Sequence, residues 1–200
     1  MKTKILVLIL LVMMLCYKPE VVYIAAEPTI AAEPTIETEP EPEPEPEPTI
    51  ATEPEFQPEI YNIPLADDLQ LYTYNLCEEY GITLHYPLVL AVMGHESRYD
   101  EKVISRTNDY GLMQLNKVNH NWLREKLSIT DFLDAKQNIH AGVYMLSTYL
   151  NKYDTVNEAL MAYNMGEGGA RKQWAAGNYS TAYTTKVLSV LDLIISDNYN

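Results

Sequence analysis

Apolar residues recur at helical spacing through most of residues 61–200. The first stripe has three- and four-residue intervals and is followed by Gly81, a natural helix stop; its members are Leu65, Leu69, Tyr72, Leu76 and Tyr80. The next segment, Leu88 to Met93, is apolar without interruption. A helix with an exposed face would carry polar residues there, so this segment predicts a buried helix that begins near Pro87, a residue suited to a first helical turn.

Later stripes predict further helices, and their apolar members are Val118, Trp122 and Leu127; Ile139, Val143, Leu146, Leu150 and Tyr153; and Tyr183, Val187, Val190 and Ile194. A capping box of Thr155 and Glu158 opens another helix, which should run through Asn164 and stop at Gly166, Gly168 and Gly169. Only Ser105 to Asn116 offers a short hairpin, because no segment alternates convincingly between apolar and polar residues. The predicted fold class is therefore all-α, with at most a short hairpin, in one globular domain.

The N-terminal residues predict export. Lys2 and Lys4 precede an apolar run, Ile5 to Leu15, which is long enough for a signal peptide and short for a membrane span. We therefore interpret residues 1–26 as a signal peptide, with cleavage near Ala25-Ala26, or as an uncleaved anchor that would be the only membrane contact. The expected location is extracellular or associated with the cell wall. Lipidation of Cys16 is not favoured, because a large residue precedes it.

Residues 27–60 have the composition of a disordered stalk. Glu-Pro-Thr-Ile occurs three times and Glu-Pro dipeptides fill the middle of the segment, so there is almost nothing apolar to bury. Proline favours the extended polyproline II conformation, and about 33 residues at ~3.1 Å each would reach up to roughly 100 Å. This linker separates the N-terminal segment from the predicted domain, residues 61–200.

Charge and composition exclude several function classes. The domain has 16 acidic residues against 11 lysines and arginines, so nothing resembles the clustered basic surface of a nucleic-acid-binding protein. The histidines have no spacing typical of metal ligands, and we predict no metal site and no cofactor. Cys77 lies beside a stripe position, which favours a small buried residue over a nucleophile.

The candidate chemistry centres on Glu96, at the end of the buried apolar segment. A carboxyl group held against apolar walls has a raised pKa, and near neutral pH it can keep the proton that a general acid donates. His95-Glu96 does not begin a zinc-protease motif, because Tyr99 stands where the second histidine would be. Ser97 does not lie in a Gly-x-Ser-x-Gly elbow either.

Three blocks that include Glu96 carry a family resemblance: Glu96-Ser97, then Gly111-Leu112-Met113-Gln114, then Ala162-Tyr163-Asn164 followed by Gly166. Secondary matches are Asn138-Ile139 with Gly142, and Tyr183 ahead of Lys186-Val187. A single Glu-Ser pair would not identify a family, but three blocks in this order are specific to one. Over residues 69–193 the chain resembles the soluble lytic transglycosylase (SLT) family, enzymes of lysozyme-like fold that cut the glycan strands of bacterial peptidoglycan.

The resemblance implies that Glu96 is the one catalytic carboxyl group. It would protonate the oxygen between N-acetylmuramic acid and N-acetylglucosamine. The resulting carboxylate would then take the proton from the muramoyl C6 hydroxyl as that oxygen attacks the anomeric carbon, which leaves a 1,6-anhydromuramic end. The implied partners are peptidoglycan glycan strands and, as a weaker hypothesis, a secretion or conjugation machine.

The same match implies a substrate-binding set of Ser97, Met113, Gln114, Asn116, Tyr163, Asn164 and Tyr183. Ser97 and Gln114 would hydrogen-bond the sugar or steady Glu96, while the tyrosines and Asn164 would line or shape the groove. Packing competes with contact for Met113, because methionine fills irregular gaps. It competes equally for Tyr163, whose hydroxyl could find a partner in the core.

Asp109 leaves a second function open. Asp109-Tyr110-Gly111 also resembles animal-type lysozymes, in which an Asp directly before Tyr-Gly is the second carboxylate. If Asp109 faces Glu96 at about 5 to 9 Å, hydrolysis to a reducing muramic end becomes available. Asp109 could instead cap the following turn. A third alternative is a non-catalytic wall-binding or scaffold domain, which the joint presence of Glu96, Gln114 and Asn164 disfavours.

Overall fold

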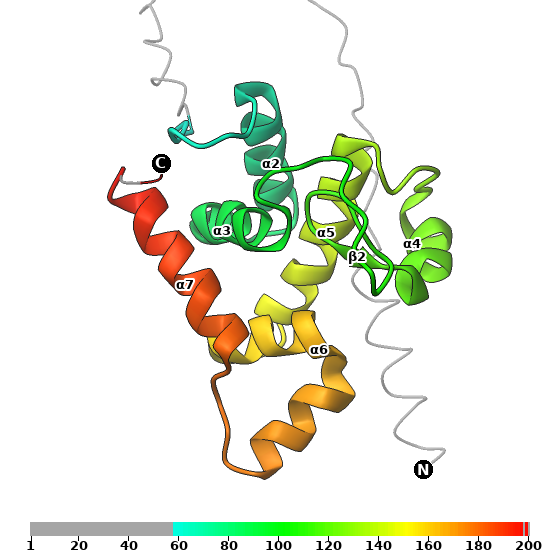
Figure 1. Ribbon diagram of the computed structural model, residues 1–200, viewed down its shortest axis with the longest axis vertical. Helices are drawn as coiled ribbons and strands as arrows, with labels where there is room; N and C mark the ends of the chain where they lie inside the picture. The colour runs from blue at the N-terminus through cyan, green and yellow to red at the C-terminus, as the bar shows by residue number, and fades with distance from the viewer. Residues whose placement is uncertain (1–57, 198, 200) are drawn as a thin grey trace, which may run out of the picture. The chain divides into compact units, whose positions relative to one another are not determined.

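Six α-helices and one small hairpin form the part of the chain that the computed structural model describes, residues 58–197 and 199 (Figure 1). The helices are α2 (Asp67–Glu79), α3 (Tyr86–Ser97), α4 (His120–Leu127), α5 (Ala135–Leu150), α6 (Val156–Ala175) and α7 (Ala182–Ile195). Short 3-10 helices precede α3 and α4, at Thr83–His85 and Lys117–Asn119. The predicted fold class is confirmed for these residues. The predictions for residues 1–57 lie outside them.

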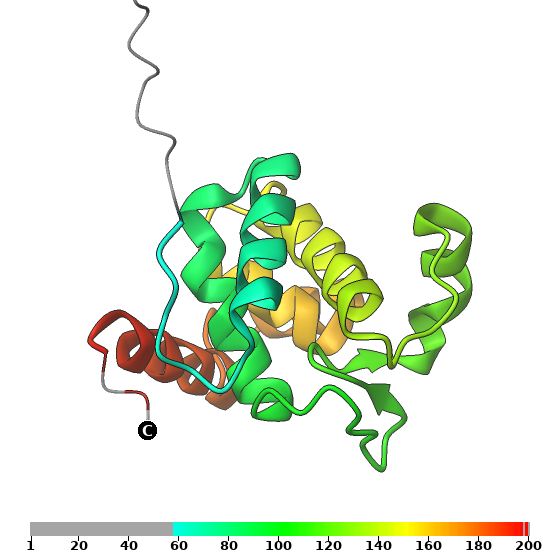
Figure 2. The ribbon, with the colours of Figure 1, turned by 90° about the horizontal axis from the view of Figure 1, so that it is seen from above.

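Helix α3 lies at the centre of the domain and is buried on every side. Leu90 and Met93 are wholly inaccessible, and the residues between them are buried as well. Each fully buried side chain of this size contributes about 1.5–3 kcal/mol. Helices α2 and α7 pack against α3, and Figures 1 and 2 show α7 and α4 on opposite sides of the domain. The uninterrupted apolar segment is thus explained by neighbours around the whole helix.

Helix α3 ends abruptly at Ser97, one residue after Glu96. Arg98 and Tyr99 both have left-handed backbone angles, with φ of 55° and 64°. This conformation costs non-glycine residues about 1 kcal/mol each. Tyr99 is nevertheless held in the core at 6% exposure. The turn leaves the last helical residues, including Glu96, at the edge of the buried region.

The hairpin is held against α5 by one amide side chain. Strand β1 (Asp109–Tyr110) pairs antiparallel with β2 (Leu115–Asn116). The buried Asn138 of α5 donates to the carbonyls of Tyr110 and Phe132 at 2.7 and 2.8 Å, and it accepts from the Met113 amide at 2.8 Å. Gly111 has φ of 67°, and a Cβ there would lie 2.6 Å from the Asn138 Nδ2. Both features require glycine at this position.

Helix α6 confirms the predicted stop at Gly166 and corrects it at Gly168 and Gly169, which lie in a further helical segment. The capping box of Thr155 and Glu158 is confirmed. The chain leaves helical geometry at Gly166, with φ 70° and ψ 159°, but the helix resumes and runs to Ala175. A glycine inside a helix costs only about 1 kcal/mol. Trp174, near the end of the second segment, packs edge-on against Tyr153 with ring centroids 4.9 Å apart, and aromatic pairs of this kind contribute about 0.5–1.5 kcal/mol.

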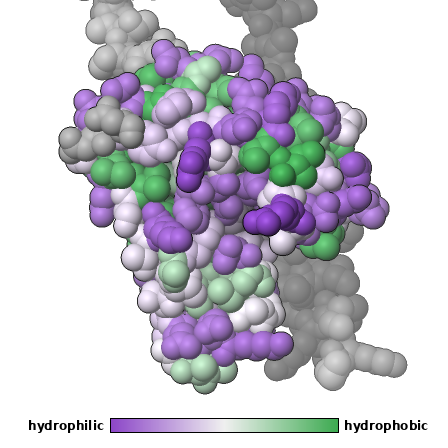
Figure 3. All heavy atoms as spheres, in the orientation of Figure 1, coloured by the Kyte–Doolittle hydropathy of each residue, from purple (hydrophilic) through white to green (hydrophobic). Residues whose placement is uncertain are grey.

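The stripe of Val118, Trp122 and Leu127 also needs correction. Helix α4 forms as predicted, but Val118 precedes it and is 82% exposed, and Trp122 is 40% exposed. Leu123 is the fully buried side chain of this helix. On the face seen in Figure 3, hydrophobic residues form separate patches among hydrophilic ones. No helix among the described residues is both long and apolar enough to cross a membrane.

Candidate active site

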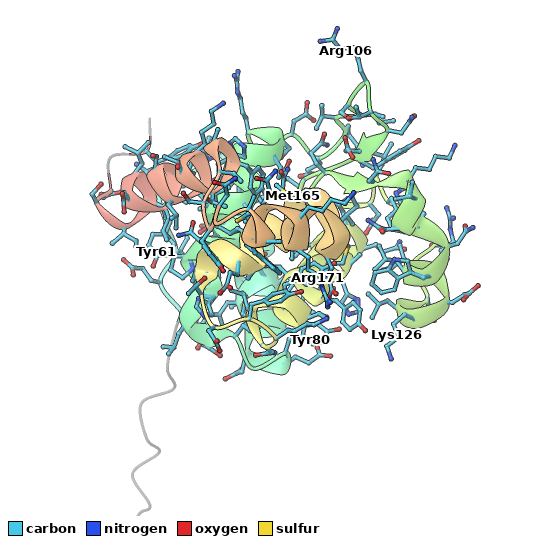
Figure 4. The ribbon with its side chains drawn as sticks, turned by 90° about the horizontal axis from the view of Figure 1, so that it is seen from below. Tyr61, Tyr80, Arg106, Lys126, Met165 and Arg171 are labelled. Carbon is cyan, nitrogen blue, oxygen red and sulfur yellow. The ribbon has the colours of Figure 1, made fainter. Side chains whose placement is uncertain are left out.

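A cleft of about 600 Å³ lies between the hairpin and helices α5 and α6, with the end of α3 at its base. Among the described residues that line the cleft, only Glu96 and Asp109 have carboxyl side chains, and none is cationic. The full lining is Glu96, Thr107, Asp109, Gln114, Leu115, Asn116, Val118, Asn119, Met145, Tyr149, Ala162, Tyr163, Asn164, Met165 and Gly166. Arg106 comes from the loop beside the hairpin but points outward from the domain (Figure 4). The cleft is therefore polar and acidic.

Glu96 has the protonation behaviour of a general acid. Burial against the apolar end of α3 raises its pKa from an ordinary 4.5 to about 7, and the negative charge of Asp109 adds to the increase. The hydrogen bond from Tyr183 acts in the opposite direction and lowers the pKa. Near neutral pH the group is therefore partly protonated, and it can both donate and accept a proton.

Tyr183 reaches Glu96 from the other end of the domain sequence. Its hydroxyl donates to the Glu96 Oε1 at 2.7 Å, across a separation of 87 residues. The packing of α7 on α3 makes this contact possible. Burial raises the pKa of Tyr183 well above its ordinary value, so the phenol stays a donor. The His95 ring packs edge-on against Tyr183, with centroids 5.1 Å apart.

Asp109 is an anion held by three donors. Its Oδ2 accepts from the hydroxyls of Ser105, at 2.6 Å, and of Thr107. Its Oδ1 accepts from the Asn116 amide at 2.7 Å. Partial burial pushes the pKa of Asp109 upward, but the hydrogen bonds from Ser105, Thr107 and Asn116 together outweigh burial and hold the pKa below its ordinary value. Asp109 is therefore ionised whenever Glu96 titrates.

Gln114, Asn116, Tyr163 and Asn164 line the cleft, as predicted for substrate-binding residues. The Gln114 amide nitrogen donates to the Gly111 carbonyl at 2.9 Å, which braces the turn between the strands. Tyr163 combines both of its predicted roles, because it lines the cleft and its hydroxyl donates to the Met113 carbonyl at 2.8 Å.

Ser97 and Met113 lie behind the surface of the cleft. The Ser97 hydroxyl donates to the Met93 carbonyl at 3.1 Å, within its own helix. Met113 is wholly buried against Gly142, where an added Cβ would lie 2.1 Å from the Met113 sulfur. The structure thus places these two side chains in supporting positions, and the packing interpretation holds for Met113. Gly142 is required because a larger residue would displace Met113.

Sequence reasoning missed the donors that hold Asp109. The Ser105 hydroxyl also accepts from the backbone amides of Thr107 and Asp109, both at 3.1 Å. Small hydroxyl residues two and four positions before an aspartate, in a loop, can signal such a local network. No three His, Cys, Asp or Glu side chains gather in a metal-binding arrangement within the described chain. Cys77 is fully buried on α2, as predicted, and burial raises the pKa of its thiol to about 12.

Two known proteins are similar to part of this chain. Membrane-bound lytic murein transglycosylase F of Desulfosudis oleivorans is 34% identical over 93 residues, which cover 43% of this chain and 20% of that protein. The transglycosylase of Enterobacteria phage PRD1 is 32% identical over 111 residues, covering 56% of this chain and 39% of the phage protein. The chain therefore spans a minor part of the length of both relatives.

A solved structure shares the fold. The X-ray structure of an inactive mutant of the lytic transglycosylase Slt from Pseudomonas aeruginosa superposes with a TM-score of 0.52 at 19% identity, covering 64% of this chain and 24% of that one. At this identity the likeness concerns the fold alone. The family model described as the transglycosylase SLT domain matches residues 77–186, from α2 to α7 and across the whole cleft. Since that match covers more than half of the sequence, the chain belongs to the SLT transglycosylase domain family, in the lysozyme-like superfamily.

Proposed function

We propose that this chain is a peptidoglycan lytic transglycosylase that cleaves the β-1,4 bond between N-acetylmuramic acid and N-acetylglucosamine. The observation that carries the proposal is Glu96, a carboxyl group at the base of a polar cleft with a pKa of about 7. Such a group can protonate the glycosidic oxygen, and its carboxylate form can then accept a proton. The family membership and the relatives named as transglycosylases support the same activity.

The proposed reaction is internally balanced. Protonation by Glu96 breaks the bond between the muramoyl anomeric carbon and the leaving oxygen. The muramoyl C6 oxygen then bonds to the anomeric carbon, and its proton passes to Glu96, which regenerates the acid without consuming water. The product is a 1,6-anhydromuramic end. Tyr183 would keep its hydrogen bond to Glu96 Oε1, which fixes the orientation of the carboxyl group.

The state of Asp109 favours this reaction over hydrolysis. A hydrolase of the inverting type needs a second carboxylate that takes a proton from water. Asp109 accepts three side-chain hydrogen bonds and has a lowered pKa, so it is a weak base. A fixed anion can still stabilise positive charge at the anomeric carbon. Hydrolysis remains the second candidate, because Asp109 is ionised and lines the same cleft as Glu96.

Mass spectrometry of the muropeptides released from peptidoglycan by the purified full-length chain tests the proposal. We expect anhydromuramic ends that disappear with Glu96→Gln. Reducing muramic ends would show a hydrolase instead and make Asp109 the next residue to change. Glycan binding without any cleavage by the unaltered chain would support the non-catalytic scaffold.

Export and service to a secretion or conjugation machine extend the proposal. The apolar segment Ile5 to Leu15 supports export. Fractionation of the producing cells would test it, and we expect the chain in the wall or medium fraction. For the machine, the phage relative named a transglycosylase is the available support. A deletion strain with unchanged assembly and transfer by such a system would contradict that role.

A further inference from the structure

We propose that Trp122 forms an additional sugar-binding subsite, which extends the cleft along α4 and takes a pyranose ring of the glycan strand. The proposal rests on the proposed function, since the ligand is the same strand that Glu96 would cleave. It concerns binding at a distance from the reacting bond. The argument uses the exposure of Trp122, its link to the cleft wall and the aromatic residue across from it.

The exposure of Trp122 is not explained by the core. Its side chain is 40% exposed, whereas Trp174, the other tryptophan of the chain, packs at 4.9 Å on Tyr153. Leaving apolar surface in water costs about 25 cal/mol per Å². A single exposed apolar residue is ordinary, but contiguous exposed apolar surface beside a groove marks a ligand-binding surface. Trp122 is also the residue at which the predicted packing stripe fails.

Trp122 is continuous with the wall of the cleft. Val118 and Asn119, of the 3-10 helix that leads into α4, line the cleft four and three residues before Trp122. The Trp122 Nε1 donates to the Asn119 Oδ1 at 3.4 Å, so the indole is tethered to a lining residue. Val118 is 82% exposed and adds apolar surface to the cleft lining near the start of α4.

The opposite side of the cleft continues in the same direction. The Tyr144 ring of α5 lies 5.9 Å from Trp122 at an angle of 54°. The next residue of α5, Met145, lines the cleft, as does Tyr149 one turn later. The Trp122 ring therefore faces α5 from α4, outside the residues that line the cleft around Glu96. A strand that leaves the catalytic residue between the hairpin and α5 would reach the indole next.

The chemistry of this surface suits a sugar ring. A pyranose presents a flat face of C–H groups, and the electron-rich face of an indole attracts such groups while its apolar body excludes water. The tethered nitrogen keeps the ring in one orientation. The cleft that leads to Trp122 carries no cationic side chain among its described lining residues, so it has no partner for a carboxylate of the peptide stem. We therefore assign the subsite to a sugar.

Tryptophan fluorescence of the full-length Glu96→Gln chain tests the subsite, because this variant would bind strands without cutting them. The probes are a peptidoglycan disaccharide and longer peptidoglycan glycan fragments without peptide stems. We expect only the longer fragments to change the emission. Trp174→Phe should keep that change, and Trp122→Phe should remove it. Trp122→Ala should weaken the binding of long fragments about tenfold, equal to about 1.4 kcal/mol, and leave disaccharide binding unchanged.

A matched control separates this effect from a general loss of apolar surface. Leu84 is 95% exposed and lines a separate cavity beside α7, so Leu84→Ala should not alter glycan binding. Thermal melts would verify that the variants fold. Unchanged binding of long fragments by Trp122→Ala, or loss of the emission change in Trp174→Phe, would overturn the subsite. If the unaltered chain does not cleave peptidoglycan but long fragments still change the Trp122 emission, the proposed function fails and the subsite stands. If the chain cleaves peptidoglycan but long fragments do not change the emission, the proposed function stands and the subsite fails.

Discussion

The two walls of the cleft shift the pKa of a carboxyl group in opposite directions. On the helical wall, burial of Glu96 at the end of α3 raises its pKa to about 7. On the hairpin wall, Ser105, Thr107 and Asn116 surround Asp109 with donors and lower its pKa. The environments thus push the two pKa values apart, which is how one site obtains an acid and a stable anion at the same pH. Single substitutions on each wall can test which of the two carboxyl groups transfers the proton.

The largest expected effect is the loss of activity in Glu96→Gln. Glutamine keeps the shape of the protonated acid but cannot transfer a proton. General acid catalysis contributes about 10²–10⁴-fold, so we expect cleavage to fall by about 10³-fold or more. The measurement is the rate of muropeptide release at neutral pH. Residual activity within tenfold of the unaltered chain would remove Glu96 from the mechanism and shift attention to the hairpin wall.

The same substitution should increase stability at alkaline pH. Because the folded state raises the pKa of Glu96 from 4.5 to about 7, it binds this proton more tightly than the unfolded chain does. The associated stability is fully present below about pH 4.5 and is lost as the pH rises through about 7. Above that pH the buried charge costs about 3 kcal/mol. Thermal melts should therefore show Glu96→Gln more stable than the unaltered chain at pH 8, with little difference at pH 4.

Asp109→Asn should weaken activity by about a hundredfold, the size expected when one electrostatic contact to a transition state is lost. Removing this charge also removes an interaction that raises the pKa of Glu96. The alkaline limb of kcat/KM, which reports the acid of the free enzyme, should consequently move to lower pH. A limb that does not move would mean that Asp109 has no electrostatic link to Glu96. The product ends would show at the same time whether the chemistry has changed.

Tyr183→Phe should have a smaller effect and shift the pH profile the other way. It removes the 2.7 Å hydrogen bond that lowers the pKa of Glu96, so the alkaline limb should move to higher pH. We expect activity to fall about tenfold, in line with the worth of one hydrogen bond to a charged group. Opposite shifts in Tyr183→Phe and Asp109→Asn would establish that the two walls tune one acid. Shifts in the same direction would contradict the comparison.

The sequence predicted the elements whose residues contact their neighbours at regular intervals. The stripes of α2, α5 and α7, the buried α3 and the capping box of α6 are local patterns, and these elements were confirmed, although Tyr153 of the predicted α5 stripe lies beyond the helix, which ends at Leu150. The prediction failed where tertiary contacts decided the outcome. The chain breaks helical geometry at Gly166, as predicted, but Gly168 and Gly169 lie in a further helical segment, in which Trp174 packs on Tyr153. The α4 stripe did not become core: Val118 precedes the helix, and Trp122 is 40% exposed.

The site shows the same division. Motif positions identified several residues of the cleft lining, including Glu96, Gln114, Tyr163 and Asn164. They could not show that Met113 is buried behind that lining, because its depth depends on close contact with Gly142 of another helix. The hydrogen bond between Trp122 and Asn119 is local, but whether the Trp122 ring can face a ligand depends on the position of α5, which carries Tyr144. The signal peptide and the stalk stay predictions.

The two carboxyl groups also differ in how they can be inherited. The donors of Asp109 all come from one short segment, Ser105 to Asn116, so a recombination event that exchanges this segment transfers the anion complete with its support. The surroundings of Glu96 are assembled from α3 and, 87 residues later, Tyr183 of α7. No single exchanged segment of that size carries both. The segment that holds the Asp109 anion can therefore be exchanged as one unit. The surroundings that set the pKa of Glu96 are kept only when α3 and α7 are exchanged together.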